Sequence, residues 1–469
     1  MRHRVRLGLL VAVVMAVVAT AATMATASSG SASAAPIKIG ILSDCQGAFG
    51  AQYAADIGGA IAAFDQFAGA KPTNSSDPTK GMTGGAVAGH PLKIGGFGCS
   101  NDNAQRAISE TKRLMEQLGA QILIGPLSGD EAVAVAHYAQ AHSAKTFING
   151  TAGSQDPTLQ IAPKNFFRYN GDGAQWNAGI GDFAFHKLHW KTAAIIMDDY
   201  SFGWTSAAGM IADFCAVGGK IVKRVFPPLN TTDYSSFVRQ LPPPNKVDGY
   251  FWVVGGTGTV ASLKAMQAAY PGSVSGKKMI GNLFFEVTGN FQQVAPLITG
   301  AYVGGFGTPG TDYKGAAALK YVSQQSKIWK SLGSALGAMN TANAFNGFYF
   351  NYWKAAWALV KGLQSVKGNI ANQKPLQAAL SKVVLNTPFG TVKLDKNRQA
   401  IEGEWSYQVI AQPGKTEVKT VQFIPNVDQS FGGTFKHSSP PPGRTQPPCQ
   451  KRSLPWVGKE KPVVNGVIK

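Results

Sequence analysis

The chain of 469 residues is poor in cysteine and in charge, with four cysteines and 15% charged residues. No two cysteines form a CxxC pair, and none has metal-ligand spacing to a histidine. In an exported chain such a pattern favours disulfides over a metal site. Four cysteines allow three pairings, and their spacing does not select one.

Motifs for phosphate, hydrolase and metal chemistry are also missing. The turn "CQGAFGAQ" (45–52) has neither the Lys nor the hydroxyl of a P-loop, and its Gly47 and Gly50 do not complete GxGxxG. The segment "DDYSFG" departs from GxSxG, and HExxH does not occur. His186 and His189 stand three residues apart without a third ligand nearby, which indicates surface positions. We therefore predict a protein that is not an enzyme and holds no metal or cofactor.

Long apolar runs are confined to the N-terminus. Arg2, Arg4 and Arg6 precede an apolar run of about 16 residues, and small residues follow as far as "SASAA". This layout predicts a signal peptide over residues 1–34, cleaved after Ala34, and hence an exported protein. The run is short for a membrane span, and an uncleaved anchor is the alternative.

Acidic residues are few: 25 Asp and Glu stand against 44 Lys and Arg, a formal charge of +19. The basic residues are dispersed, except after Pro440, where six of them face only Glu460. A nucleic-acid interface requires basic residues gathered with aromatics on one face. We therefore expect a basic secreted surface and no nucleic-acid partner.

The chain does contain a regular alternation of apolar strands and helical patterns. Continuously apolar segments such as "QILIG" (121–125) and "KTAAIIMDD" (191–199) alternate with helices in two successive series. Such strands are typical of parallel sheets that are covered on both faces, so the chain is predicted to form two α/β lobes. In such sheets a ligand binds beyond the carboxyl ends of the strands. The segments at these ends are rich in Gly, Ser and Thr: 43–50, 125–131, 149–157, 198–203, 255–259 and 281–286.

Eight sequence pieces carry a family resemblance, in family order: "IKIGILSDCQGAFG…DIGGAIAAFDQ", "IGPLSGDEAVAVAHYAQ", "TFINGTAGSQDPTL", "NFFRYNGDGAQW", "AAIIMDDYSFGWTSA", "VDGYFWVVGG", "GNLFFEVTGN" and "TPFGTVKLDKN". Over roughly residues 36–412 the chain resembles type I periplasmic solute-binding proteins of the leucine/isoleucine/valine-binding group, which feed ABC importers. The resemblance implies two doubly wound parallel-sheet lobes, joined by crossover strands, that close on a ligand. The implied parts are lobe 1 (35–168 and about 302–390), lobe 2 (169–301 and about 391–430) and a Pro-rich basic tail (431–469).

The resemblance also implies a set of cleft residues: Phe49, Ser128, Gly129, Thr151, Gly153, Ser154, Tyr200, Phe202, Thr257 and Glu286. Phe49 or Tyr53 would form an apolar lid, although both could simply pack in the core. Ser128 or the Gly129 N–H would bind a carboxylate, or Ser128 could serve only as a helix N-cap. Glu286 would bind an amine, with a solvated loop acid as the alternative.

The remaining cleft positions follow the same family pattern. Thr151, Gly153 and Ser154 would offer backbone groups and a hydroxyl, and Tyr200 and Phe202 would supply the aromatic wall of the second lobe. Thr257 replaces a frequent aromatic, so a smaller or more polar wall is expected there.

In sheets of this family the strands that end at Cys45 and Cys99 are neighbours, which implies a Cys45–Cys99 disulfide. Cys215 and Cys449 would then pair and staple the tail to the second lobe, the alternative being two free thiols. The function implied is delivery of an amino acid or related small carboxylate, by a monomer, to the membrane subunits of an ABC importer. An extracellular sensor with the same fold is the alternative, and it would need a transmembrane segment or a partner receptor.

Overall fold

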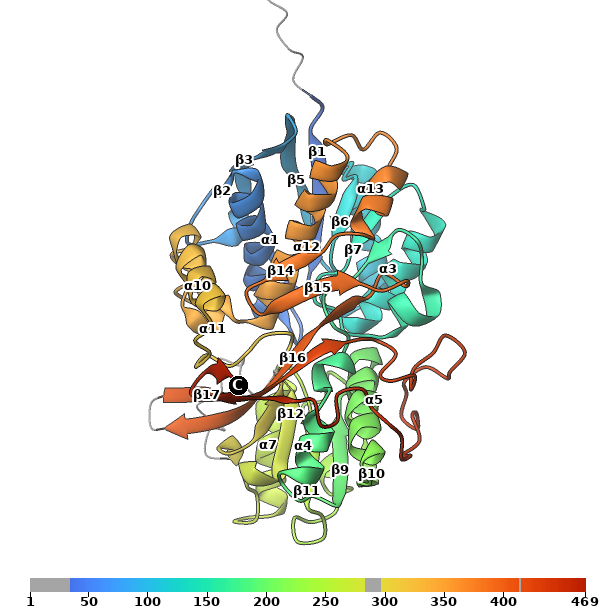
Figure 1. Ribbon diagram of the computed structural model, residues 1–469, viewed down its shortest axis with the longest axis vertical. Coiled ribbons are helices and arrows are strands. Elements are labelled where there is room, and N and C mark those ends of the chain that lie inside the picture. Colours follow the sequence, from blue (N-terminus) through green and yellow to red (C-terminus); the bar gives the residue numbers. More distant parts are fainter. Residues whose placement is uncertain (1–33, 283–296, 413–414) are drawn as a thin grey trace, which may run out of the picture.

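The computed structural model describes residues 34–282, 297–412 and 415–469, which form two lobes joined by crossing chain segments (Figure 1). The first lobe is built on a six-stranded sheet in the order β4-β5-β1-β6-β7-β8, parallel from β5 to β8. A small antiparallel pair, β2 and β3, lies beside it. The strands of this lobe are β1 Ile37–Ser43, β2 Ala70–Pro72, β3 Met82–Gly84, β4 Ala86–Val87, β5 His90–Cys99, β6 Ile122–Ile124, β7 Thr146–Ile148 and β8 Phe166–Phe167.

The second lobe has the larger sheet, in the order β10-β9-β11-β12-β13-β16-β17-β18-β19, with β14 and β15 attached through β16. It is parallel from β10 to β13 and antiparallel beyond. Because β13 pairs with β12, the chain returns to the first lobe after residue 304, slightly later than the predicted 302. The strands are β9 Thr192–Met197, β10 Lys220–Val225, β11 Gly249–Val253, β12 Met279–Asn282, β13 Tyr302–Gly304, β14 Leu385–Thr387, β15 Gly390–Leu394, β16 Ala400–Gln412, β17 Lys415–Val427, β18 Lys461–Val464 and β19 Val467–Ile468.

Helices cover both faces of each sheet, which explains why the strands read as continuous apolar runs. In β1, Ile41 enters the core shared with α1 and α12, while the next residue, Leu42, enters the core under α2 and α3. In β9, Ile195 and Ile196 divide in the same way between the two faces of the second sheet. The helices are α1 Tyr53–Ala68, α2 Ala104–Lys112, α3 Gly129–Ala141, α4 Ile180–His186, α5 Ser201–Ala216, α6 Ser235–Val238, α7 Gly258–Ala269, α10 Ala316–Ile328, α11 Thr341–Ala344, α12 Gly347–Ser365 and α13 Lys374–Leu380.

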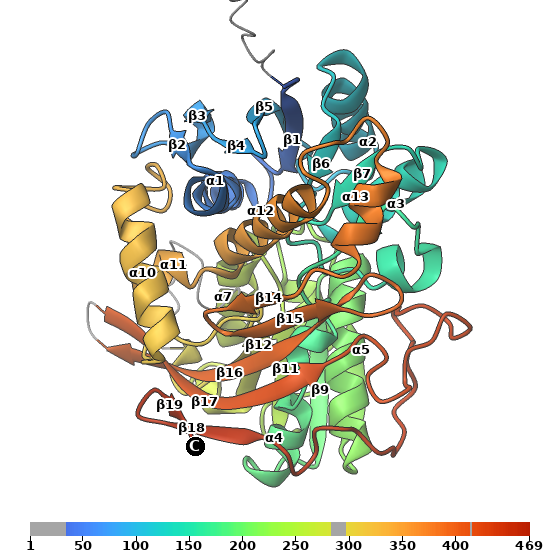
Figure 2. The ribbon, with the colours of Figure 1, turned by 45° about the horizontal axis from the view of Figure 1, so that its top comes forward.

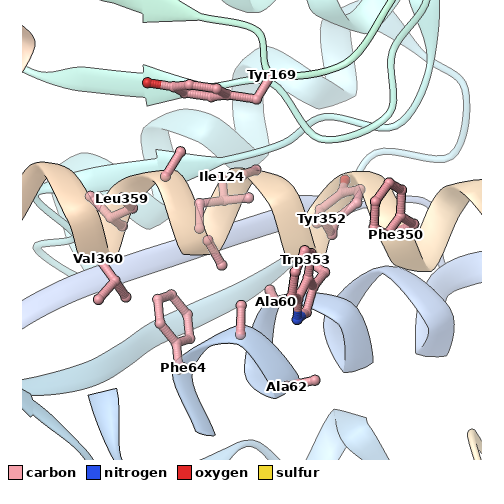
Figure 3. Close-up of a cluster of buried hydrophobic side chains, with 14 of the residues drawn as sticks. Ala60, Ala62, Phe64, Ile124, Tyr169, Phe350, Tyr352, Trp353, Leu359 and Val360 are labelled. Atoms are coloured by element: carbon pink, nitrogen blue, oxygen red, sulfur yellow. The ribbon is translucent and has the colours of Figure 1, made fainter. Parts of the chain in front are cut away.

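The closest helix packing in the first lobe joins α1 to α12. A Cβ at Gly59 would lie 2.0 Å from the Tyr349 carbonyl oxygen, so only glycine allows this approach. Phe64 of α1 and Leu359, Val360 and Trp353 of α12 fill the core around the contact (Figure 3).

Buried charges fix the crossing segments between the lobes. The Lys354 ammonium of α12 donates to Glu402 of β16 at 2.5 Å, and the Gly171 N–H donates to the same carboxylate. The Arg168 guanidinium is fully buried, donates to Gln399 and Thr158, and lies 3.8 Å from Asp172. Burial lowers the pKa of Arg168 to about 10, so the group stays charged at neutral pH. These contacts tie the crossing segment that contains Arg168 and Gly171 to the one that leads into β16, and they tie the latter to α12.

Both disulfides that the resemblance implied are present. Cys45 is bonded to Cys99, which joins the ends of the neighbouring strands β1 and β5. Cys215 near the end of α5 is bonded to Cys449. We refer to residues 431–469 as the C-terminal segment; it runs along the second lobe and ends in the strands β18 and β19 (Figure 2). Among the helices of the described ranges, none combines the length and apolarity that crossing a bilayer requires.

Candidate ligand-binding site

A small cavity lies between the two lobes, at the carboxyl ends of the strands. Its volume is about 20 Å³, and one water molecule needs roughly 10–15 Å³ when measured in the same way. The lining comes from both lobes and from a crossing segment, and it consists of Phe49, Leu127, Ser128, Gly129, Thr151, Gly153, Trp176, Tyr200, Phe202, Phe306 and Phe348. The position agrees with the ligand crevice of open parallel sheets.

Aromatic rings form most of the cavity wall. Trp176 stacks on Phe306 with centroids 3.9 Å apart, and Phe202 lies 5.8 Å from Trp176. Phe348, at the start of α12, lies 5.4 Å from Phe306 and 6.5 Å from Phe49. The wall therefore presents ring faces and edges to anything held in the cavity, an environment that suits an apolar or flat group.

The polar end of the cavity is the start of α3. Ser128 is the N-cap, and its N–H donates to Glu131 at 3.3 Å, as in a capping box. The buried Ser128 side chain faces the Glu131 N–H in the same box, and its Oγ has no other hydrogen-bond partner in the described ranges. Together with the first N–H groups of α3, this hydroxyl offers donors to an anion at the positive end of a helix.

The two lobes touch around the cavity. The Ser201 N–H of the second lobe donates to Asp130 of the first at 3.1 Å, and the Gln155 N–H donates to Thr205 at 3.2 Å. A Cβ at Gly129 would lie 2.6 Å from the Ser201 Oγ. This is therefore a closed arrangement of the lobes, and glycine at position 129 is what permits it.

A cluster of carboxyl groups lies behind the turn that carries Phe49. The Asp44 carboxylate accepts hydrogen bonds from the Asp102 N–H at 3.0 Å and the Ser100 hydroxyl at 3.1 Å. Burial, followed by the charge of Asp44, raises the pKa of Asp102 to about 9. The same two causes raise the pKa of Glu131 well above its usual value. The cluster therefore retains protons at neutral pH.

Seven of the ten predicted cleft residues line this cavity: Phe49, Ser128, Gly129, Thr151, Gly153, Tyr200 and Phe202. Ser154 is buried next to it but does not line it. Thr257 is exposed at the N-cap of α7, so the structure does not bring it to the cavity. Tyr53, the alternative lid, packs against the core of the first lobe instead. Glu286 lies outside the described residues.

Four lining residues were missed: Leu127, Trp176, Phe306 and Phe348. Trp176 ends the quoted piece "NFFRYNGDGAQW" and was available as a signal. Phe306 lies just after β13, and Phe348 at the start of α12. Phe306 follows the last parallel strand, whose end was not among the segments considered, whereas Phe348 does not follow a strand and cannot be found from strand ends.

The sequence over residues 36–414 matches the family model described as periplasmic binding protein. The match spans most of the chain, and the chain therefore belongs to the periplasmic binding protein family. No curated protein matches the sequence. The C-terminal segment lies beyond the end of the family match.

Solved structures share the fold at low sequence identity. A solute-binding protein of an ABC transporter from R. palustris, in complex with benzoate, is 20% identical, with 84% of this chain and 97% of that chain covered and a TM-score of 0.66. An ABC transporter substrate-binding protein from Sphaerobacter thermophilus is 18% identical, with 84% and 99% covered and a TM-score of 0.67. A leucine-binding protein from Thermotoga maritima is 17% identical, with 82% and 97% covered and a TM-score of 0.63.

Proposed function

We propose that the protein is the extracytoplasmic solute-binding subunit of an ABC importer and closes its two lobes on an amino acid or related small carboxylate. Family membership supports a binding role, and the solved relatives named above support the link to ABC transporters. Two of those relatives carry benzoate or leucine in their names, and both compounds join a carboxylate to an apolar group.

The observation that carries the proposal is the division of the cavity into a polar end and an aromatic wall. A carboxylate placed at the start of α3 would meet the Ser128 hydroxyl and the Gly129 N–H, while the apolar group would lie among Trp176, Phe202 and Phe306. A volume of about 20 Å³ is far too small for such a ligand, so loading requires the lobes to part.

The deciding experiment is identification of the native ligand. Protein purified without denaturant is analysed by native mass spectrometry, the released small molecule is identified, and its binding is measured by calorimetry. A single carboxylate that rebinds unchanged is the expected result. Chemical turnover of the compound, or a ligand without a carboxylate, would contradict the proposal.

Within this proposal, Glu286 decides whether the ligand is an amino acid or a simple carboxylate. A buried carboxylate is a good partner for an ammonium, and an unpaired member of such a pair costs several kcal/mol. Glu286→Gln is therefore expected to weaken amino-acid binding by about tenfold or more. An unchanged affinity, or a natural ligand without an amine, would remove Glu286 from the site while leaving the carboxylate end intact.

The partners proposed are the membrane subunits of the importer, which the closed, loaded protein would meet as a monomer. The purified protein is expected to elute as a monomer in light-scattering chromatography. Added to membranes that contain the transporter, it should stimulate ATP hydrolysis only when loaded with ligand.

A further inference from the structure

The C-terminal segment is attached to the second lobe at both ends of α5. At the start of the helix, the Arg444 guanidinium forms a two-pronged ion pair with Asp199, with Nε donating to Oδ1 at 2.8 Å and Nη2 to Oδ2. At its end, Cys449 is disulfide-bonded to Cys215. Trp456 is buried and donates its indole N–H to Asp213 at 2.8 Å. These contacts hold the segment at the two ends of the helix.

The same segment also contacts the first lobe. Residues Pro157–Ile161 form a single helical turn between β7 and β8 of the first sheet. The His437 ring nitrogen Nδ1 lies 2.9 Å from the Leu159 carbonyl oxygen, and the Gln160 amide donates to the Ser439 carbonyl at 3.3 Å. Leu159 further shares one apolar core with Phe431, Phe435 and residues of α5. The segment therefore bridges the two lobes.

Asp199, the partner of Arg444, adjoins the wall of the cavity in sequence. It immediately precedes Tyr200, which lines the cavity, and Ser201, whose N–H donates to Asp130 across the lobes. The Asp199 carboxylate also accepts the Trp204 indole N–H at 2.9 Å, and its backbone N–H donates to the Pro227 carbonyl at 2.8 Å. The side chain of Asp199 is 9% exposed, so Arg444 supplies charge compensation to a group largely removed from water.

We propose that the C-terminal segment is a strap that holds the Asp199–Ser201 wall in place and ties the lobes together, biasing the protein toward the closed arrangement. Arg444 acts as a positioning residue, since it reaches the cavity only through Asp199. The segment lies outside the family match, so this role is additional to the proposed function and rests only on its premise that the lobes part and close.

The physical reason is that the strap is covalently fixed to one lobe and bonded to the other. Any opening that separates the 157–161 turn from α5 must break the His437 and Gln160 contacts and expose the apolar surface around Leu159. Each lost contact disfavours the open arrangement. A ligand that binds the closed arrangement would then bind more tightly, because less of its binding free energy is needed to close the lobes.

The test needs no ligand. Small-angle scattering measures the radius of gyration, and hydrogen–deuterium exchange follows peptides that cover residues 199–205 and 157–161. Arg444→Gln and the double variant Cys215→Ser/Cys449→Ser are compared with the wild-type protein. We expect both variants to be more extended and to exchange at least tenfold faster in both peptides. Arg444→Lys keeps the charge but loses the two-pronged geometry. Its radius of gyration and exchange rates should therefore lie between those of the wild-type protein and Arg444→Gln.

Two controls separate the strap from general destabilisation. Lys451→Gln removes an exposed charge from the same segment, and Cys45→Ser/Cys99→Ser removes the disulfide that lies within the first lobe. Both should keep the wild-type radius of gyration. The Arg444 side chain is 67% exposed, so its replacement leaves the core intact even where the double cysteine variant fails to fold.

An unchanged radius of gyration and unchanged exchange at 199–205 in Arg444→Gln would overturn the strap. That result would leave solute binding untouched. Conversely, the wild-type protein could bind no carboxylate while the strap variants still open. That result would contradict the proposed function and leave the strap intact.

Discussion

Trp176 and Phe306 stack face to face, with ring centroids 3.9 Å apart and planes inclined by 16°. One ring stands at the start of the second lobe and the other on the segment that returns to the first. The pair therefore forms a floor for the cavity at the place where the lobes meet.

Phe306→Leu is expected to weaken binding of the native ligand by about two- to tenfold, because an aromatic pair contributes about 0.5–1.5 kcal/mol beyond its buried area. Calorimetry with the ligand identified by mass spectrometry measures the change. Phe389→Leu alters a ring in the core of the first lobe and serves as the control, which should lose stability without losing affinity. Equal affinity losses in both variants would show that the Trp176–Phe306 pair is not part of the binding site.

Gly129→Ala is expected to prevent closure. The new methyl group would lie 2.6 Å from the Ser201 Oγ and 2.9 Å from the Phe202 nitrogen, closer than side chains tolerate. Scattering should show a larger radius of gyration, and ligand affinity should fall by more than about tenfold. Gly443→Ala, where the nearest atom would be 4.0 Å away, is the matched control.

Asp102→Asn is expected to flatten the dependence of stability on pH. The Asp102 pKa rises to about 9 in the folded protein, against about 3.9 in the unfolded chain, so folding takes up a proton between these values. This group therefore lowers the free energy of unfolding as pH rises, by up to about 1.4 kcal/mol per pH unit. Urea unfolding from pH 5 to 9 measures the slope. Asp233→Asn is the control: hydrogen bonds from Ser235 lower the pKa of Asp233, so it stays ionised over this range and its replacement should leave the slope unchanged.

Lys354→Met is expected to lower the free energy of unfolding by about 3–5 kcal/mol, since it leaves the buried Glu402 side chain without its ion-pair partner. The double variant Lys354→Met/Glu402→Gln removes both charges and should recover most of the loss. Denaturant unfolding of the three proteins checks the cycle. A double variant no more stable than the single one would show that the pair does not act as a unit.

Reduction of the Cys45–Cys99 bond is expected to cost about 4 kcal/mol, because the bond closes a loop with a sequence separation of 54. Non-reducing peptide mapping should find peptides linked 45–99 and 215–449. A 45–215 or 99–449 linkage would overturn both pairings.

The fold could be predicted from the sequence because its signal is repeated. Each central strand is apolar on both faces, as Ile41 and Leu42 show, and that pattern recurs in the second lobe. The site was predicted in part for the same reason: residues that follow parallel strands must gather at one edge. Phe348 could not be placed this way, since it reaches the cavity from a helix almost two hundred residues after Thr151. Thr257 was carried over from a family position, and the local turn instead leaves it at the exposed start of α7.

The packing of α12 against α1 also governs how the protein folds. Gln52, just before α1, bonds to Asn346, which caps α12, across a sequence separation of 294. The core of the first lobe cannot close until residues beyond 360 have left the ribosome, whereas the strands of the second lobe from β9 to β12 are contiguous. Contacts this distant in sequence slow folding. The N-terminal strands therefore wait until most of the chain has been synthesised for α12, the helix that together with α1 covers one of their faces.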